Sequence, residues 1–146
     1  MNVSTVSFLF KDFDLFQKAY EIRKTVFIDE QKVSPQEELD GLDAGCIHFL
    51  IFLEEKAIGT GRLRYINANT MKVERIAILK EFRKNGYGID LMKAIEEKAK
   101  IMKIKNLTMN AQLYAKKFYE RLGYKADGEV FEEAGIKHIK MTKEVI

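Results

Sequence analysis

A basic, glycine-containing turn joins an apolar run to a helical pattern in the middle of the chain. The apolar run at residues 73–78 is rich in branched side chains and is bounded by polar ones, as is typical of a buried strand. The turn has the sequence Arg83-Lys84-Asn85-Gly86-Tyr87-Gly88. After it, apolar residues recur at helical spacing, namely Leu91, Met92, Ile95, Ala99 and Met102. Strand–helix alternation of this kind indicates an α/β fold.

The same turn has the features of a phosphate-binding loop. Backbone N–H groups in the first turn of a helix lack partners, and the helix dipole favours an anion there. Gly86 and Gly88 let the backbone come close to a ligand, and Arg83 and Lys84 add positive charge. The turn lacks Gly-Lys-Ser/Thr and the third glycine of Gly-x-Gly-x-x-Gly, so it is neither a Walker loop nor a dinucleotide fingerprint. Because a glycine pair also occurs in ordinary strand–helix turns, other parts of the chain must distinguish a phosphate-binding loop from such a turn.

The remaining pattern predicts one domain over residues 1–146. Strands are expected at residues 3–10, 47–53, 57–66, 72–78, 106–111, 130–131 and 137–142. Helices are expected after Asp12, at residues 88–102 and at residues 113–122, and residues 29–45 read as an acidic loop with room for a short helix. Strands first, then strand–helix–strand alternation, predict a mixed twisted sheet with helices on both faces.

Composition disfavours several classes of protein. Hydrophobic residues make up 47% and charged residues 32%, which excludes a largely disordered chain. The net charge of +3 is spread along the sequence, so a nucleic-acid partner is not expected. The single Cys46 suits a reducing compartment, and neither a membrane span nor a secretory signal is evident. His48 and His138 are far apart without other ligands at metal spacing, so no metal is expected. We expect a cytoplasmic monomer or homodimer with no membrane partner.

Two motifs resemble those of the GNAT superfamily of N-acetyltransferases. Arg83-x-x-Gly86-x-Gly88 resembles the family's Arg/Gln-x-x-Gly-x-Gly/Ala loop, which grips the pyrophosphate of coenzyme A. The second motif is matched by Ala115-Lys116-Lys117-Phe118-Tyr119-Glu120-Arg121-Leu122-Gly123-Tyr124. More narrowly, residues 40–43, 111–112 and 134–139, with His48, are similar to a small bacterial acetyltransferase subgroup. The resemblance covers nearly the whole chain and implies the GNAT acyl-CoA N-acyltransferase fold, with acetyl-CoA as cosubstrate.

The resemblance also implies which residues bind the cofactor. Pyrophosphate would lie against Arg83, Lys84, Asn85, Gly86, Tyr87 and Gly88. The backbone of Ile76, Ala77 and Ile78 would bind the pantetheine arm like an added strand, and one N–H there would stabilise the oxyanion. Phe118 and Tyr119 of the second motif complete the set. The family usually has asparagine at Gln112, so either Gln112 or Asn110 would contact pantetheine, and the sequence leaves this open.

Two residues are candidates for proton transfer. Tyr119 matches the family tyrosine that protonates the departing thiolate, and a phenol is a competent acid because it stays protonated at neutral pH. Its alternative role is that of a core tyrosine. Glu74 is expected to share a strand face with Ile76 and Ile78, where it would take the proton of the amine directly or through water. Its alternative role is that of an ordinary strand carboxylate.

Four carboxylates gather in a short stretch between the first helix and the second expected strand. They are Glu37, Glu38, Asp40 and Asp43. One interpretation is a solvated loop, as most charge runs are. The other is an acceptor entrance, where the carboxylates would attract a cationic amine by electrostatic focusing.

The residues and the resemblance together predict an acetyl-CoA-dependent N-acetyltransferase. The acetyl group would pass directly, through a tetrahedral intermediate, to a primary amine of a small molecule or peptide. Arg23, Phe27, Glu38, Asp40 and Asp43 are also similar to residues of acyl-homoserine-lactone synthases, but those enzymes are longer and typically carry tryptophan, which this chain lacks. A non-catalytic CoA-binding regulatory module is the third possibility.

Overall fold

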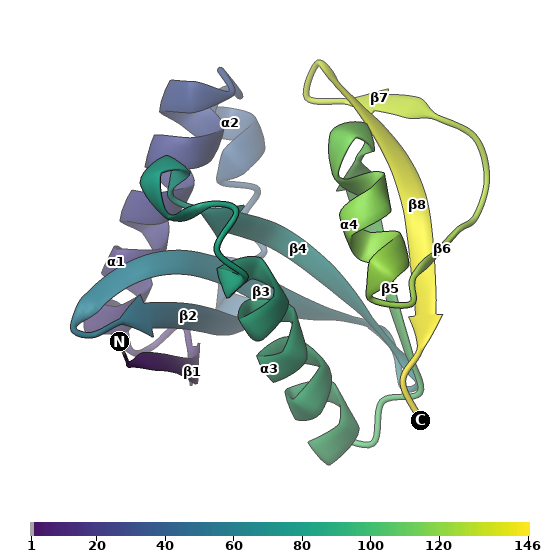
Figure 1. Ribbon diagram of the computed structural model, residues 1–146, viewed down its shortest axis with the longest axis horizontal. Coiled ribbons are helices and arrows are strands. Elements are labelled where there is room, and N and C mark those ends of the chain that lie inside the picture. Colours follow the sequence, from purple (N-terminus) through teal and green to yellow (C-terminus); the bar gives the residue numbers. More distant parts are fainter. Residues whose placement is uncertain (1) are drawn as a thin grey trace.

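One continuous eight-stranded sheet with helices on both faces forms the frame of the molecule, which is described by a computed structural model for residues 2–146 (Figure 1). The strand order is β1-β2-β3-β4-β5-β8-β6, and β7 also pairs with β8. The strands are β1 (Val3–Leu9), β2 (Ile47–Leu53), β3 (Lys56–Asn67), β4 (Thr70–Ile78), β5 (Asn106–Gln112), β6 (Lys125–Ala126), β7 (Phe131–Glu133) and β8 (Ile136–Glu144). The expected mixed α/β fold is confirmed.

Within residues 2–146, four α-helices, one π-helix and three short 3₁₀ turns connect the strands. They are α1 (Phe13–Arg23), the π-helix η1 (Lys24–Glu30), α2 (Pro35–Glu38), η2 (Asp43–Gly45), η3 (Lys80–Phe82), α3 (Tyr87–Ile101), η4 (Leu113–Ala115) and α4 (Lys116–Arg121). Asp12 caps α1, as expected, by accepting a hydrogen bond from the Leu15 N–H at 3.4 Å. Ser34 caps α2 in the same way, and Pro35 occupies its first position. The acidic stretch is therefore partly helical.

The sheet opens between β4 and β5. These parallel strands pair only at Thr70–Lys72 with Asn106–Thr108 and then diverge, while β5 stays paired with β8 along its length. Because β4 has no partner on this side beyond Lys72, its backbone can bind another extended group there. Figure 1 shows the two strands spreading apart, with α3 beginning beyond the end of β4 and α4 beside β5.

A β-bulge interrupts β4 at Arg75. Gly61 of β3 faces two β4 residues, Arg75 and Ile76, and Arg75 has a left-handed φ of 59°. The extra residue reverses the alternation of side chains. Ile76 and Ile78 therefore pack against the cluster beneath α3, whereas Glu74 contacts Arg62 on the opposite face. The expectation that Glu74 shares a face with Ile76 and Ile78 is thus wrong, and the bulge is the reason.

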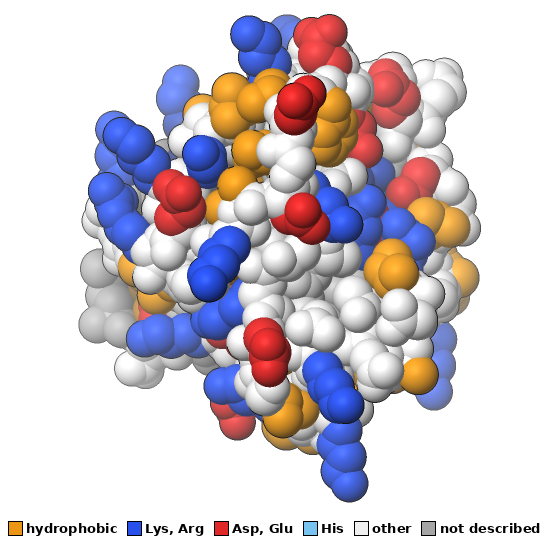
Figure 2. All heavy atoms as spheres, turned by 90° about the vertical axis from the view of Figure 1, so that its right-hand side faces the viewer, with side chains coloured by type: hydrophobic (Ala, Val, Ile, Leu, Met, Phe, Trp, Pro, Cys, Tyr) orange, Lys and Arg blue, Asp and Glu red, His pale blue; other side chains and the backbone are white. Residues whose placement is uncertain are grey.

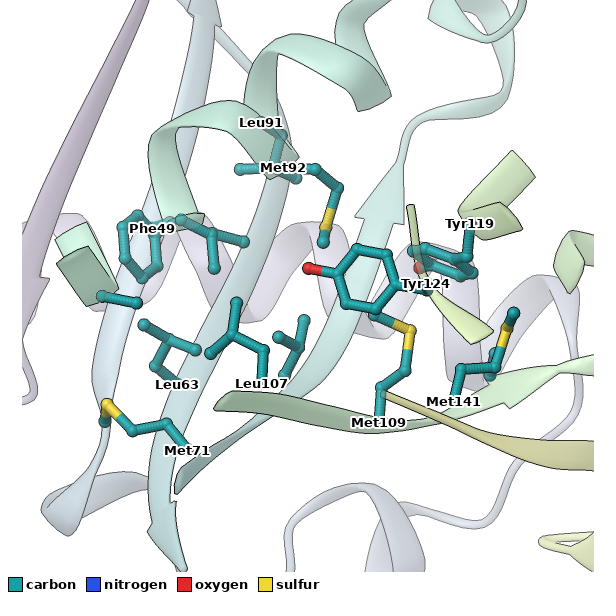
Figure 3. Close-up of a cluster of buried hydrophobic side chains, with 14 of the residues drawn as sticks. Phe49, Leu63, Met71, Leu91, Met92, Leu107, Met109, Tyr119, Tyr124 and Met141 are labelled. Atoms are coloured by element: carbon teal, nitrogen blue, oxygen red, sulfur yellow. The ribbon is translucent and has the colours of Figure 1, made fainter. Parts of the chain in front are cut away.

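Two apolar clusters hold the helices on the sheet. The larger lies under α3 and α4 and includes Leu91, Ile95 and Tyr119. Figure 3 shows its centre, where Met92 and Met109 lie beside the ring of Tyr124. The smaller cluster lies under α1 and comprises Phe8, Ala19, Ile22, Val26, Leu50 and Ala77. Burial on both faces makes the middle of the sheet a rigid support for the opening between β4 and β5.

The surface carries both signs of charge. Figure 2 shows the face formed on the right of Figure 1, where Lys and Arg side chains alternate with Asp and Glu side chains rather than forming one basic block. Within residues 2–146, no helix has the length and apolar character needed to cross a membrane.

Candidate active site at the opening between β4 and β5

The opening between β4 and β5 gathers the residues that the two motifs predicted. The Arg83–Gly88 turn follows β4 and leads into α3, and Phe118 and Tyr119 lie on α4, which follows β5. Two contacts join these parts directly. The Arg83 Nε donates to the carbonyl of Ile78 at 2.8 Å, and Gly88 packs on the ring of Phe118.

The turn before α3 presents free backbone donors. Gly86 is the N-cap of α3 with φ +84°, and Lys84 also has a left-handed φ of 66°. Within residues 2–146, the backbone N–H groups of residues 85–88 have no acceptor. A Cβ at Gly86 would meet nothing within 4 Å, so space is open beside these donors. An oxyanion such as a phosphate fits this turn, because the helix dipole and the N–H groups point the same way.

Gly88 packs closely against α4, and its expected contact with a cofactor stays a prediction. A Cβ at this position would lie 3.2 Å from Cζ of Phe118, which is tighter than an ordinary contact. The small residue therefore allows α4 to pack against the first turn of α3. Its close neighbour in the structure is Phe118, and it is Gly86 that borders open space.

Arg83 is already engaged by a carboxylate. Its two terminal nitrogens bind the two carboxylate oxygens of Glu30 at 2.7 and 2.8 Å, in a bidentate pair. The hydrogen bond from Arg83 lowers the pKa of Glu30, so this carboxyl is ionised at neutral pH. Glu30 could not be identified from sequence patterns, because this pair joins residues 53 positions apart.

Gln112 is held in a similar way by Gln31. The two side-chain amides exchange hydrogen bonds of 3.1 and 2.9 Å between β5 and the end of η1. Asn110 pairs through its strand with Lys140 of β8. Both amides are half-buried, and which of them contacts a cofactor stays a prediction.

Tyr119 combines a packed ring with an unpaired hydroxyl. The residue is 7% exposed, and its ring contacts Phe118 and Tyr124 edge-on, with centroid separations of 5.0 and 5.9 Å. Within residues 2–146 the only fully buried polar side-chain atom without a partner is Nε of Arg75, so the unpaired Tyr119 hydroxyl keeps some contact with solvent. Burial raises the pKa of Tyr119, which keeps the phenol protonated.

Glu74 lies among three cations. Its carboxylate accepts hydrogen bonds from Arg62 and Arg64 at 2.9 to 3.2 Å, and the Lys72 Nζ is 3.6 Å away. Burial alone would raise the pKa of Glu74, but hydrogen bonding from Arg64 and the charges of Arg62, Arg64 and Lys72 lower it. Such a carboxylate accepts a proton less readily than an ordinary glutamate does.

The acidic stretch forms a buried ion-pair network instead of an open row of carboxylates. Arg23 binds Glu38 at 2.7 Å and Asp43 at 2.8 Å, and these three side chains are almost fully buried. Arg62 binds Asp43 at 2.8 Å and Asp40 at 2.6 Å. Neither a solvated loop nor a row of free carboxylates describes this arrangement. Arginines thus neutralise Glu38, Asp40 and Asp43, which weakens the basis for expecting a cationic acceptor, whereas the exposed carboxylate of Glu37 contacts only Ser34 within residues 2–146.

Arg62, the centre of this network, was missed by the sequence reading. Its side chain is 0% exposed and contacts three carboxylates, those of Asp40, Asp43 and Glu74. A signal was present, because an arginine in the middle of a strand next to apolar residues must find carboxylates when buried.

The histidines and the cysteine have structural contacts. The His48 Nε2 lies 2.9 Å from the carbonyl of Asp43, and burial lowers the pKa of His48. The Cys46 thiol donates to the carbonyl of Leu42 at 3.1 Å, and burial raises its pKa. Among residues 2–146, no group of three or more His, Cys, Asp or Glu side chains is arranged to hold a metal ion.

Comparison with known proteins identifies close relatives. The family model described as acetyltransferase (GNAT) domain matches residues 18–145. The chain is 43% identical to the uncharacterized protein YyaT of Bacillus subtilis, over 88% of each chain. It is 36% identical to the uncharacterized N-acetyltransferase YjcF of the same organism, over 92% of this chain and 96% of YjcF.

Solved structures share the fold at lower identity. A GNAT family acetyltransferase from Elizabethkingia anophelis with acetyl-CoA bound superposes with a TM-score of 0.75 at 18% identity, over 98% of both chains. The acyl-homoserine-lactone synthase LasI superposes with a TM-score of 0.83 at 16% identity, over 99% of this chain and 91% of LasI. At these identities the likeness concerns the fold alone.

Proposed function

This chain belongs to the GNAT acetyltransferases, and from that premise we propose that it transfers the acetyl group of acetyl-CoA directly to a primary amine of a small molecule or peptide. The observation that carries the proposal is the turn before α3. Its unpaired N–H groups at residues 85–88 lie beside open space at Gly86, next to the end of a strand whose edge is free.

The chain's residues fit acetyl-CoA. GNAT relatives have been solved with acetyl-CoA or coenzyme A bound. In this chain, the N–H groups of the turn would hold the pyrophosphate, and the free edge of Ile76–Ile78 would hold the pantetheine arm. One backbone N–H after the bulge would then stabilise the oxyanion, because a fixed donor beside a developing charge lowers the barrier.

The proposed transfer is a direct displacement at the thioester. The neutral amine attacks the thioester carbonyl, and a tetrahedral intermediate forms with a negative oxygen. The C–S bond then breaks as the Tyr119 hydroxyl gives its proton to the departing sulfur. The nitrogen loses one proton, and Tyr119 recovers a proton from solvent. The unpaired hydroxyl supports this role for Tyr119, and its raised pKa keeps the phenol protonated before transfer, although it also makes the phenol a weaker acid.

Glu74 is retained as the candidate base, in an indirect role. Its three cationic neighbours lower its pKa and occupy its oxygens. Transfer of the amine proton through a water molecule beside Glu74 fits these contacts better than direct abstraction does.

A donor and acceptor screen tests the proposal. Acetyl-CoA is incubated with a panel of primary amines, and mass spectrometry detects a gain of one acetyl group while a thiol reagent measures free coenzyme A. Acetylated amine with a matching amount of free thiol supports an acetyltransferase. Binding of acetyl-CoA without product from any amine points to the regulatory module. Lactone formation from S-adenosylmethionine and an acyl donor points to the synthase.

A further inference from the structure

Glu30 and Gln31, two neighbours outside both sequence motifs, hold the two arms of the opening between β4 and β5. Glu30 binds Arg83, in the turn between β4 and α3, through two hydrogen bonds of 2.7 and 2.8 Å. Gln31 binds Gln112 at the end of β5 through two hydrogen bonds of 2.9 and 3.1 Å. Both residues stand where the π-helix η1 ends, so one short segment bridges the two arms.

Each contact reproduces the chemistry of a cofactor group. A carboxylate presents two anionic oxygens to a guanidinium as a phosphate does. A side-chain amide exchanges one donor and one acceptor with Gln112, as a pantetheine amide can. We propose that Glu30 and Gln31 are internal stand-ins for the cofactor, which hold Arg83 and Gln112 in place until the phosphates and the pantetheine arm displace them. This inference rests on the proposed function, because it requires acetyl-CoA at this site.

The pair between Glu30 and Arg83 is suited to displacement. Both side chains remain about one-third exposed, at 35% and 34%, so solvent weakens their attraction. Arg83 also has a second anchor, since its Nε donates to the carbonyl of Ile78 at 2.8 Å. Its two terminal nitrogens can therefore change partner while the rest of the side chain stays fixed. By contrast, the buried pair of Arg23 and Glu38, 1% exposed, is closed to such exchange.

Displacement has a measurable cost for cofactor affinity. Any binding energy spent on breaking an internal contact is lost from the observed affinity. Removing the charge of Glu30 should then tighten acetyl-CoA binding by about 1.5- to 5-fold, the range expected for an exposed ion pair. Removing the Gln31 amide should tighten binding of the pantetheine arm by about 2- to 10-fold, as expected for one net hydrogen bond.

Calorimetric titration of three variants tests the inference. Glu30→Gln and Gln31→Ala are compared with the parent, and Asp29→Asn is the matched control. Asp29 carries the same charge one residue away, is 55% exposed and, within residues 2–146, forms an ion pair with Lys24 alone. Each protein is titrated with acetyl-CoA and with acetyl-pantetheine, which lacks the phosphates, and thermal melting verifies that each variant is folded.

Comparing acetyl-CoA with acetyl-pantetheine distinguishes the effect of the Glu30–Arg83 contact from that of the Gln31–Gln112 contact. The inference expects Glu30→Gln to tighten acetyl-CoA and leave acetyl-pantetheine unchanged, Gln31→Ala to tighten both, and Asp29→Asn to alter neither. Weaker or unchanged acetyl-CoA binding in Glu30→Gln, or the same gain in Asp29→Asn, overturns it. If the parent itself does not bind acetyl-CoA, the proposed function fails along with this inference. If the parent binds and only the variant pattern fails, the proposed function stands.

Discussion

Arg62 donates to Asp43 at 2.8 Å in the interior of the protein, where the arginine is 0% exposed and the aspartate side chain 9% exposed. The same guanidinium also binds Asp40 and Glu74. This pairing joins the segment after α2 to the middle of β3, and through Glu74 to β4 just before the bulge. The network therefore fixes the backbone that the cofactor's pantetheine arm is proposed to follow.

Replacing Arg62 with methionine should strongly destabilise the fold. The variant leaves Asp40, Asp43 and Glu74 with one cation fewer, and breaking a buried ion pair from one side costs about 3–5 kcal/mol of unfolding free energy. Arg64→Met is the matched control, because Arg64 is 28% exposed and Glu74 is its one carboxylate partner among residues 2–146. That variant should lose less than about 1 kcal/mol. Urea denaturation measures the unfolding free energy of both variants. Equal losses would show that the buried Arg62 contributes no more to stability than the more exposed Arg64.

The free energy of unfolding should decrease as the pH is lowered through the acid range, because Asp40 becomes protonated. Burial raises the pKa of Asp40, but hydrogen bonds from Arg62 and from the Leu42 N–H, together with nearby arginine charges, bring it from 3.8 down to about 2. A carboxyl whose pKa is lower in the folded state stabilises that state when ionised. Its contribution is complete above the unfolded-state value of 3.8 and is lost as the pH falls toward about 2.

Melting temperatures between pH 6 and pH 2 test this dependence. The parent should be more stable than Asp40→Asn at pH 6, and the difference should shrink as Asp40 is protonated in the parent. Curves that stay parallel over the whole range would show that Asp40 does not titrate as its contacts indicate.

Much of the fold was predictable because helical and strand periodicity are local properties. The spacing of Leu91, Ile95 and Ala99 predicted α3 to within one residue at each end. The helix predicted at residues 113–122 begins instead with the short 3₁₀ turn η4, and α4 is confined to Lys116–Arg121. Gly123, with a left-handed φ of 96°, follows the end of this helix, where glycine is a common residue.

The features that shape the site were not predictable by the same means. The π-helix η1 arises from a shift in backbone hydrogen bonding that leaves the apolar spacing nearly unchanged. The bulge places Arg75 in a left-handed conformation, which is uncommon for arginine and therefore could not be predicted from the residue type. The partners of Arg23 and Arg62 lie 12 to 22 residues away, so their pairing depends on the assembled sheet.

Gly86→Val should abolish acetyl-CoA binding without unfolding the protein. At φ +84° a β-branched residue is strained, which costs about 1–2 kcal/mol and shifts the N–H groups of the turn. Gly135→Val is the matched control, because Gly135 has φ +74° and equally open surroundings but lies in the turn between β7 and β8. Calorimetry should find binding lost in the first variant and kept in the second. Retained affinity in Gly86→Val would remove the turn from the cofactor site.

Tyr119→Phe should lower the turnover number while leaving cofactor affinity nearly unchanged. The substitution keeps the ring packed against Phe118 and Tyr124 and removes only the hydroxyl proton. General acids contribute about 10²–10⁴-fold to a rate, and we expect a loss near the lower end, about 10²-fold in kcat. Because the hydroxyl has no protein partner within residues 2–146, its removal leaves no buried group unsatisfied and should cost little stability.

Tyr124→Phe should have the opposite effect to Tyr119→Phe, because it should lower stability and leave the turnover number unchanged. The Tyr124 hydroxyl donates to Glu96 at 2.9 Å, and the same carboxylate accepts from Lys143 at 2.8 Å. Loss of that bond should reduce the unfolding free energy by about 1–3 kcal/mol, because hydrogen bonds to charged groups are stronger than neutral ones. Its kcat should be unchanged, since this hydroxyl is already committed to Glu96. Single-turnover kinetics and urea denaturation on both variants separate the roles, and a full rate in Tyr119→Phe when the chemical step is rate-limiting would make Tyr119 a packing residue.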